Sequence, residues 1–138
     1  DKWLALAQAG MALMSSDSPT LGGALGEAGL VGIGQLRDAR SKQRFLGLQP
    51  EPRKGLKSGH IQGSKNLHYQ LLINNDRTFK KKEELMKIFD LNKIDKDKDI
   101  AFTCGSGVTA CILGLANSII SGKKPKVYDG SWSEYGLE

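Results

Sequence analysis

The feature that most constrains the fold is a short apolar run joined to a longer apolar run by a glycine-rich turn. DIAFT ends at Thr103, CGSGVT follows at residues 104–109, and ACILGLANSII starts at Ala110. The first run is typical of a buried strand and the last of a buried helix, which Gly122 is placed to end. A strand–turn–helix unit of this kind is the repeating unit of α/β proteins.

The same alternation of strands and helices continues along the rest of the chain. Strands are expected at residues 31–37, 66–69, 100–103 and 126–129, and helices at residues 3–14, 78–90 and 110–121. Residues 47–63 form a long turn-rich stretch with two prolines, and loops of this length in compact domains are often functional. We therefore predict an α/β fold with a mainly parallel sheet and helices on both faces.

Composition divides the chain near residue 30. Residues 1 to about 30 are rich in Ala, Gly, Ser and Met, and the signals for strands and helices become clearer from Asp38 onward. A chain of 138 residues suits one compact domain. The apolar stretch at 3–14 is too short to span a bilayer, so we expect no membrane partner.

Charge and cysteine content narrow the classes of partner. The net charge of +5 is spread over lysine runs such as 80–82 and 123–124, without interleaved aromatic residues. This pattern does not favour a nucleic acid as a partner, but it suits a small anionic substrate. Cys104 and Cys111 would lie about 10 Å apart on a helix, too far for a disulfide, so both are expected to be free thiols in a reducing compartment.

Cys104 is the candidate nucleophile because it lies where a tight turn meets a helix start. Free backbone N–H groups and the positive end of the helix dipole favour an anion there, so the pKa of the thiol should fall below its usual value of about 8.5. Gly105 and Gly107 would allow positive φ and an inward-pointing nest of N–H groups. Ser106 adds a hydroxyl donor, and Thr109 is placed to cap the helix. From spacing alone, a buried structural cysteine remains an equal alternative.

Three motifs in order resemble the rhodanese superfamily. CGSGVTACILGLA and the later VYDGSWSEYG resemble the catalytic loop and C-terminal segment of its 3-mercaptopyruvate sulfurtransferase type, and DARSKQRFLGLQPEPRKGLKSGHIQGSKNL resembles the region after the first strand. The match covers roughly the last 100 residues and corresponds to the family's C-terminal catalytic domain. The resemblance therefore implies a catalytic domain at 38–138 and leaves 1–37 as an atypical, partly helical extension or linker. The resemblance implies a five-stranded parallel α/β sheet, a loop cysteine that carries sulfur as a persulfide, and no metal or organic cofactor.

The resemblance also assigns roles to individual residues. Cys104 matches the sulfur-accepting nucleophile, and Ser106 matches a hydroxyl implicated in proton handling or substrate polarisation. Arg44 and Arg53 match the arginines that hold the substrate's carboxylate and keto groups, a role suited to the guanidinium fork. The loop amides match the cradle around the sulfur, and this expected binding set is Gly105, Gly107, Val108 and Thr109.

For other residues the resemblance favours structural roles. Asp38 and Arg40 are expected to form a supporting ion pair, and His60 to pack at a turn rather than act as a base. Trp132 is at least as consistent with core packing as with substrate contact. Cys111 is expected to fill the buried face of its helix.

Residue spacing argues against two other kinds of site, a phosphatase loop and a calcium-binding loop. A cysteine-dependent phosphatase needs an arginine six residues after the nucleophile, where this chain has Ala110. Asp95, Asp97 and Asp99 imitate the start of an EF-hand, but the sixth position, which requires glycine, is Ile100. Neither phosphate chemistry nor calcium binding is therefore expected.

The predicted function is transfer of sulfur from 3-mercaptopyruvate, or thiosulfate, through a Cys104 persulfide to a thiol acceptor or cyanide. The alternative is a single rhodanese module that carries persulfide, senses redox state or binds a partner with little turnover. Expected partners are a small anionic sulfur donor and a thiol such as thioredoxin, and the family's tandem arrangement leaves room for a second rhodanese domain. The expected location is cytoplasmic or mitochondrial.

Overall fold

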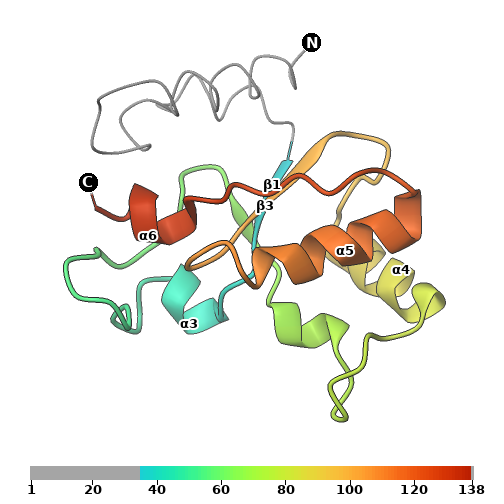
Figure 1. The fold of residues 1–138 in the computed structure, drawn as a ribbon, viewed down its shortest axis with the longest axis horizontal. Helices are drawn as coiled ribbons and strands as arrows, with labels where there is room; N and C mark the ends of the chain where they lie inside the picture. The colour runs from blue at the N-terminus through green and yellow to red at the C-terminus, as the bar shows by residue number, and fades with distance from the viewer. Residues whose placement is uncertain (1–34, 138) are drawn as a thin grey trace.

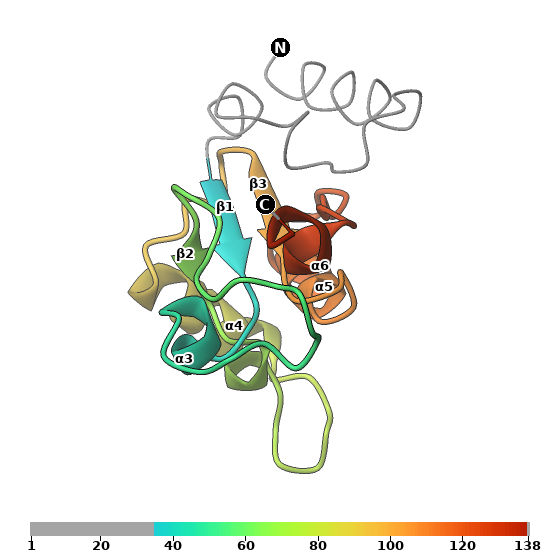
Figure 2. The same ribbon diagram turned by 90° about the vertical axis from the view of Figure 1, so that its left-hand side faces the viewer.

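Parallel strands form the centre of the molecule. The computed structural model describes residues 35–137. Within this part, β1 (Gln35–Asp38), β2 (Lys65–Asn66) and β3 (Ile100–Thr103) form a parallel sheet in the order β2-β1-β3 (Figure 2). Val127 adds one further parallel bridge, to Phe102 of β3. The predicted α/β class and parallel sheet are confirmed, whereas the five-strand count stays a prediction.

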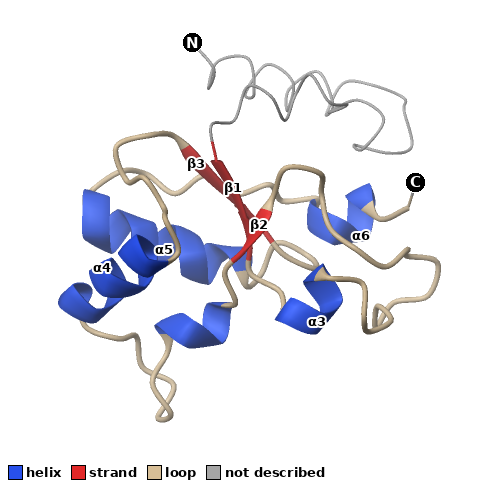
Figure 3. Cartoon of the chain, turned by 180° about the vertical axis from the view of Figure 1, so that it is seen from behind, coloured by secondary structure: helices blue, strands red, loops and turns tan. Residues whose placement is uncertain are grey.

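Helical segments cover both faces of the sheet, as predicted. The described helices are α3 (Lys42–Phe45), the 3-10 helix η1 (Tyr69–Leu72), α4 (Lys82–Leu91), α5 (Ala110–Ser121) and α6 (Ser131–Tyr135). In Figures 1 and 3, α4 and α5 lie together on one side of the strands, and α3 and α6 lie toward the other. Two separate sets of buried apolar side chains correspond to these two sides.

Alternation along β3 divides its side chains between the two cores. Ile100 and Phe102 pack with residues of α4 and α5, including Phe89 and Leu113. Ala101 faces the opposite way and packs in the core that contains Trp132. Successive residues of a strand point to opposite faces of the sheet. A strand that helices cover on both faces is therefore apolar on both. Complete burial of one such large apolar side chain contributes about 1.5–3 kcal/mol.

Helix α5 forms over the predicted residues. It begins at Ala110 and ends at Ser121, and Gly122 adopts φ +70° immediately afterwards. A glycine in this left-handed conformation is the common helix C-terminus because it has no Cβ to clash. Helix α4 begins later than predicted, at Lys82 rather than near residue 78. The Glu84 carboxylate accepts the Lys81 N–H at 2.9 Å and fixes this later start.

Two predicted strands are much shorter in the structure. The predicted strand 66–69 contributes only Asn66, because its neighbour β1 ends at Asp38, the partner of Asn66, and the chain then turns into η1. The predicted strand 126–129 is reduced to the bridge at Val127. Short helices α3 and α6 were not predicted, since segments of four or five residues carry too little periodicity.

Other predictions fall wholly or partly outside residues 35–137. The helix predicted at 3–14 lies outside them, as do residues 31–34 of the first predicted strand. The remainder of that strand is confirmed as β1, which extends to Asp38. Within the described residues, no helix is both long and apolar enough to cross a membrane.

Candidate active site

The candidate nucleophile lies at the carboxyl end of the sheet. Cys104 follows the last residue of β3 and precedes α5, and its side chain is 1% exposed. In α/β folds the loops beyond the carboxyl ends of parallel strands are the usual ligand sites. The Gly107 N–H donates to Cys104 Sγ at 3.0 Å. The Gly107 N–H is therefore one of the loop amides directed at the sulfur.

The surroundings of Cys104 favour its thiolate. Burial by itself raises the pKa of the thiol, because it disfavours the charged form. Hydrogen bonds from the Thr109 hydroxyl and from the N–H groups of Ala110, Ser106 and Gly107 act in the opposite direction and outweigh burial. The pKa of Cys104 consequently lies below that of an ordinary cysteine. A thiolate is the nucleophilic form of the residue.

The two loop glycines serve different purposes. Gly107 has φ +92°, and a Cβ there would lie 2.8 Å from Asp129 O, so both conformation and space require glycine. Gly105 does not have positive φ, which corrects the prediction for that residue. Its lack of a side chain leaves room for Arg44, whose Nη2 would lie 2.9 Å from an added Cβ.

Thr109 stands at the N-cap position of α5 but makes no capping hydrogen bond with its side chain. Its hydroxyl is instead hydrogen-bonded to Cys104. The prediction that this side chain caps the helix is therefore wrong. A threonine at an N-cap normally satisfies a backbone N–H of its own helix. Here the hydroxyl stabilises the thiolate, and Thr109 contributes to the site more directly than predicted.

A pocket of about 260 Å³ opens beside the loop. It brings together the predicted residues from two distant parts of the sequence. Its lining consists of Arg44, Glu51, Pro52, Arg53, Leu56, Cys104, Gly105, Ser106, Val108 and Thr109. Every predicted site residue lines it except Gly107, which is buried. The long loop 47–63 supplies one wall, consistent with the functional role expected for it.

Glu51, which the sequence analysis did not select, orients Arg44. Its Oε2 lies 2.6 Å from Nη2 of Arg44, and its Oε1 lies 2.7 Å from Nη1 of Arg40. Arg40 also pairs with Asp38 at 2.7 Å, which confirms the predicted ion pair. The side chains of Asp38, Arg40 and Glu51 are at most 2% exposed. A signal was available in the sequence, since Glu51 is the acidic residue between the two candidate arginines.

The side chain of Arg53 is less constrained than that of Arg44. It is exposed at the pocket wall, and among residues 35–137 no ion pair or hydrogen bond holds its side chain. Arg44 is one quarter exposed and is fixed by Glu51. The pocket therefore has one preoriented guanidinium next to the cysteine loop and a second that can adjust to a bound anion.

The segment after Val127 holds the cysteine loop in place. Ser131 Oγ accepts the Cys104 N–H at 3.1 Å and donates to Tyr128 O at 2.8 Å. Trp132 N–H donates to Cys104 O at 2.9 Å, and Ser133 N–H donates to Gly105 O at 2.8 Å. Ser131 has φ +49°, unusual for a residue with a side chain. No sequence pattern signals this strained serine.

Three other candidate residues have structural positions. His60 stacks on Phe45 with ring centroids 3.9 Å apart, and its Nδ1 lies 2.7 Å from Phe45 O, which confirms the packing role. Trp132 is buried beneath the Arg40 guanidinium, 4.7 Å from the ring centroid, and does not line the pocket. Cys111 is exposed, which corrects its predicted place on the buried face of α5.

The chemistry available in the pocket is that of a thiolate and two guanidinium groups. Across residues 35–137, no group of three or more His, Cys, Asp or Glu residues is placed to hold a metal ion. Both described cysteines are free. The arrangement can bind a small carboxylate and attack an electrophilic atom with sulfur.

The chain is similar in sequence to named sulfurtransferases and in fold to a solved structure. It is 46% identical over 101 residues to thiosulfate/3-mercaptopyruvate sulfurtransferase 1, mitochondrial, of Arabidopsis thaliana, covering 73% of this chain and 27% of that protein. It is 44% identical over 101 residues to 3-mercaptopyruvate sulfurtransferase of Mus musculus, covering 73% and 34%. The Tum1 protein of Saccharomyces cerevisiae superposes with a TM-score of 0.72 at 32% identity, covering 85% and 41%.

These relatives are considerably longer than the chain, which spans about a third or less of the two sulfurtransferases. The model of the rhodanese-like domain matches residues 24–138. The chain belongs to the rhodanese family.

Proposed function

We propose that the chain is a sulfurtransferase that takes sulfur from 3-mercaptopyruvate onto Cys104. The observation that carries the proposal is the pairing of a stabilised thiolate with Arg44 in one pocket. The Gly107 N–H lies 3.0 Å from Cys104 Sγ, and Arg44 approaches Gly105 of the same loop. The two named sulfurtransferase relatives support the proposal.

In the first half-reaction, the thiolate of Cys104 attacks the sulfur of the donor. A new S–S bond forms and the C–S bond breaks, so that pyruvate leaves as its enolate. The enolate carbon then takes a proton, which the hydroxyl of Ser106, a lining residue of the pocket, is proposed to deliver. Arg44 and Arg53 hold the carboxylate and keto oxygens, while the loop N–H groups stabilise charge on sulfur.

In the second half-reaction, an acceptor removes the outer sulfur of the persulfide. A thiol such as thioredoxin gives a new persulfide or, with a second thiol, a disulfide and hydrosulfide, and cyanide gives thiocyanate. The Cys104 thiolate is regenerated in each case. Thiosulfate is proposed as a second donor, since the Arabidopsis relative is named for both substrates. We further propose a mitochondrial or cytoplasmic location, the first in keeping with that relative's name.

Pyruvate release tests the donor half-reaction. We expect the full chain to produce pyruvate from 3-mercaptopyruvate with cyanide as acceptor, and Cys104→Ser to produce none above background. Cys111→Ser is the matched control, because Cys111 is the other free cysteine and does not line the pocket. Equal pyruvate production by wild type and Cys104→Ser would contradict the proposal.

Mass spectrometry separates an enzyme from a carrier. Treatment with donor in the absence of acceptor should add about 32 Da, one sulfur atom, to the peptide containing Cys104. Repeated turnover with cyanide then identifies an enzyme. A single stoichiometric release of sulfur without further turnover would favour the alternative, a persulfide-carrying module.

A further inference from the structure

A second pocket lies away from the cysteine loop. Its volume is about 230 Å³. It is lined by Gln35, Leu36, Arg37, Gly63, Lys65, Lys93, Asp95 and Lys98. None of these residues lines the catalytic pocket. Gln35 pairs with Ile100 at the beginning of β3, whereas Cys104 follows the end of that strand, so the two pockets lie toward opposite ends of the sheet.

Arg37 is the buried charge of this pocket. It is 3% exposed, and its Nη2 donates to Asn92 O and Lys93 O at 3.5 and 3.2 Å. Its Nε has no hydrogen-bond partner in the described part of the chain, nor does any described carboxylate lie within ion-pairing distance. Burial lowers the pKa of Arg37 from its usual value. A buried guanidinium without a carboxylate carries a desolvation cost that an anion would offset.

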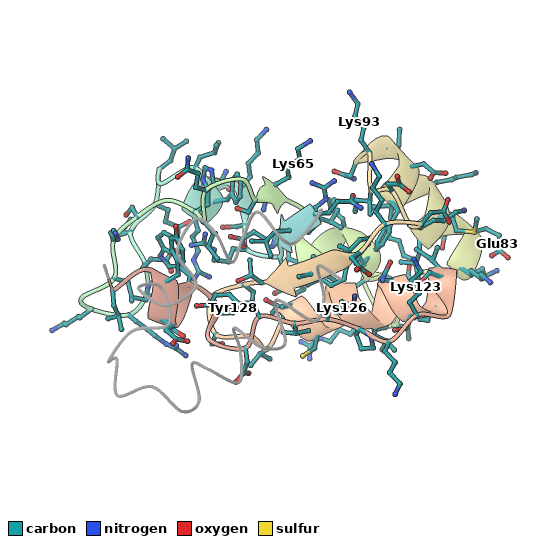
Figure 4. All side chains as sticks on the ribbon, turned by 90° about the horizontal axis from the view of Figure 1, so that it is seen from above. Lys65, Glu83, Lys93, Lys123, Lys126 and Tyr128 are labelled. Carbon is teal, nitrogen blue, oxygen red and sulfur yellow. The ribbon has the colours of Figure 1, made fainter. Side chains whose placement is uncertain are left out.

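Lysine side chains add positive charge around this pocket. Lys65, Lys93 and Lys98 are exposed lining residues. Figure 4 shows Lys65 and Lys93 projecting from the same side of the molecule. The opposing charge is Asp95, whose Oδ2 lies 3.7 Å from Lys98 Nζ. Four cationic side chains and one carboxylate therefore line this pocket, a formal excess of three positive charges.

Hydrogen bonds fix the backbone that forms one wall of this second pocket. The Gln35 side chain donates to Asp95 O at 2.7 Å and accepts the Asp95 N–H at 3.0 Å. These bonds join β1 to the turn that follows α4. Lys93 adopts φ +54° in that turn. The cationic side chains thus extend from backbone positions that are already set before any ligand binds.

We propose that this pocket binds a phosphate group, either inorganic phosphate or a small phosphate ester. Arg37 also caps the carboxyl end of α4, but that role occupies Nη2 and explains neither the unpartnered Nε nor the surrounding lysines. A guanidinium with several ammonium groups suits a multiply charged oxyanion, and the volume admits a small one. The site is independent of the proposed sulfur transfer.

Site-resolved NMR tests the proposal on the full chain. Inorganic phosphate and glycerol phosphate are titrated separately at constant ionic strength into ¹⁵N-labelled protein. We expect saturable shifts at the amides of Gly63, Lys65 and Lys93, and the tighter of the two probes identifies the source of the phosphate group. The variant Lys65→Ala/Lys93→Ala should weaken binding about tenfold or more. Lys82→Ala/Lys87→Ala, on the exposed side of α4, removes equal charge and should change binding less than twofold.

Three outcomes would contradict the proposed phosphate site. The first is shifts that remain linear, without saturation, at Gly63, Lys65 and Lys93. The second is saturable shifts confined to the catalytic loop, which would assign phosphate to the other pocket. The third is equal weakening by both lysine pairs, which would indicate general charge attraction. All four lysines are exposed, so these variants keep the core and the fold intact.

Discussion

The carboxylate of Glu51 holds the guanidinium of Arg44 beside the cysteine loop, with Oε2 and Nη2 2.6 Å apart. The same carboxylate also binds Arg40, so it connects the substrate pocket to the buried Asp38–Arg40 pair. An arginine that is already oriented loses less side-chain entropy when it binds an anion. Glu51 is therefore a positioning residue for the proposed donor.

Replacement of Glu51 should separate binding from chemistry. In Glu51→Gln, Arg44 loses its ionic partner, and we expect the KM for 3-mercaptopyruvate to rise about tenfold with a smaller change in kcat. Loss of one partner of a buried ion pair should also lower the free energy of unfolding by about 3 kcal/mol. Steady-state kinetics and urea unfolding measure the two effects. Glu83→Gln, an exposed acid on α4, is the control, and an unchanged KM in Glu51→Gln would refute the positioning role.

Removal of the Thr109 hydroxyl should change the measured reactivity of Cys104. The hydroxyl donates a hydrogen bond that favours the thiolate, so Thr109→Val should raise the pKa of Cys104. At pH values below that pKa a smaller fraction is ionised, and the alkylation rate should fall about tenfold, as for loss of one charge-assisted hydrogen bond. Iodoacetamide rates measured across pH test this. Thr109→Ser should retain the wild-type profile, whereas an identical profile in Thr109→Val would disprove the hydrogen bond's role.

The sequence predicted which residues line the pocket more completely than it predicted the bounds of the strands. Gly107 and Cys104 lie within one short turn, so their relationship depends on local geometry that a motif records directly. The position of Glu51 relative to Arg44 depends on the path of the loop 47–63, which local propensity does not determine. Likewise, the strand predicted at 66–69 ends early because β1, its pairing partner from a distant part of the sequence, ends at Asp38 opposite Asn66.

Gly105 and Gly107 should respond differently to alanine. Gly107→Ala places a Cβ 2.8 Å from backbone Asp129 O at φ +92°, so we expect about 2–3 kcal/mol less stability and a large loss of kcat. In Gly105→Ala the Cβ meets the end of the Arg44 side chain and no backbone atom, so only the Arg44–Glu51 contact has to shift, and stability should fall by less than in Gly107→Ala while the KM rises. Urea unfolding and kinetics of both variants provide the comparison. Equal destabilisation would contradict these separate roles.

Ser131 should stabilise the loop through its hydroxyl. Ser131→Ala leaves the buried Cys104 N–H without an acceptor, and we expect a loss of about 1–3 kcal/mol in the free energy of unfolding. Ser131→Gly loses the same hydrogen bonds but relieves the strain at φ +49°, so its loss should be smaller. Ser133→Ala, which removes a hydroxyl bonded to Gly130 O, is the neighbouring control. A greater loss in Ser131→Gly than in Ser131→Ala would show that the backbone is not strained.

Arg53 should determine which sulfur donor the pocket prefers. Its side chain is exposed at the pocket wall, and the described residues offer it no ionic partner, so Arg53→Ala should fold as the wild type does. The carboxylate and keto group of 3-mercaptopyruvate provide two oxygens for a guanidinium fork, whereas a thiosulfate held by Arg44 and the loop amides depends less on a second arginine. We therefore expect kcat/KM to fall about tenfold or more for 3-mercaptopyruvate and only a few-fold for thiosulfate.

Arg77→Ala, at an exposed turn outside the pocket, should leave both values unchanged. Parallel assays with the two donors measure the ratio, and equal losses for both would remove Arg53 from the determinants of donor selectivity.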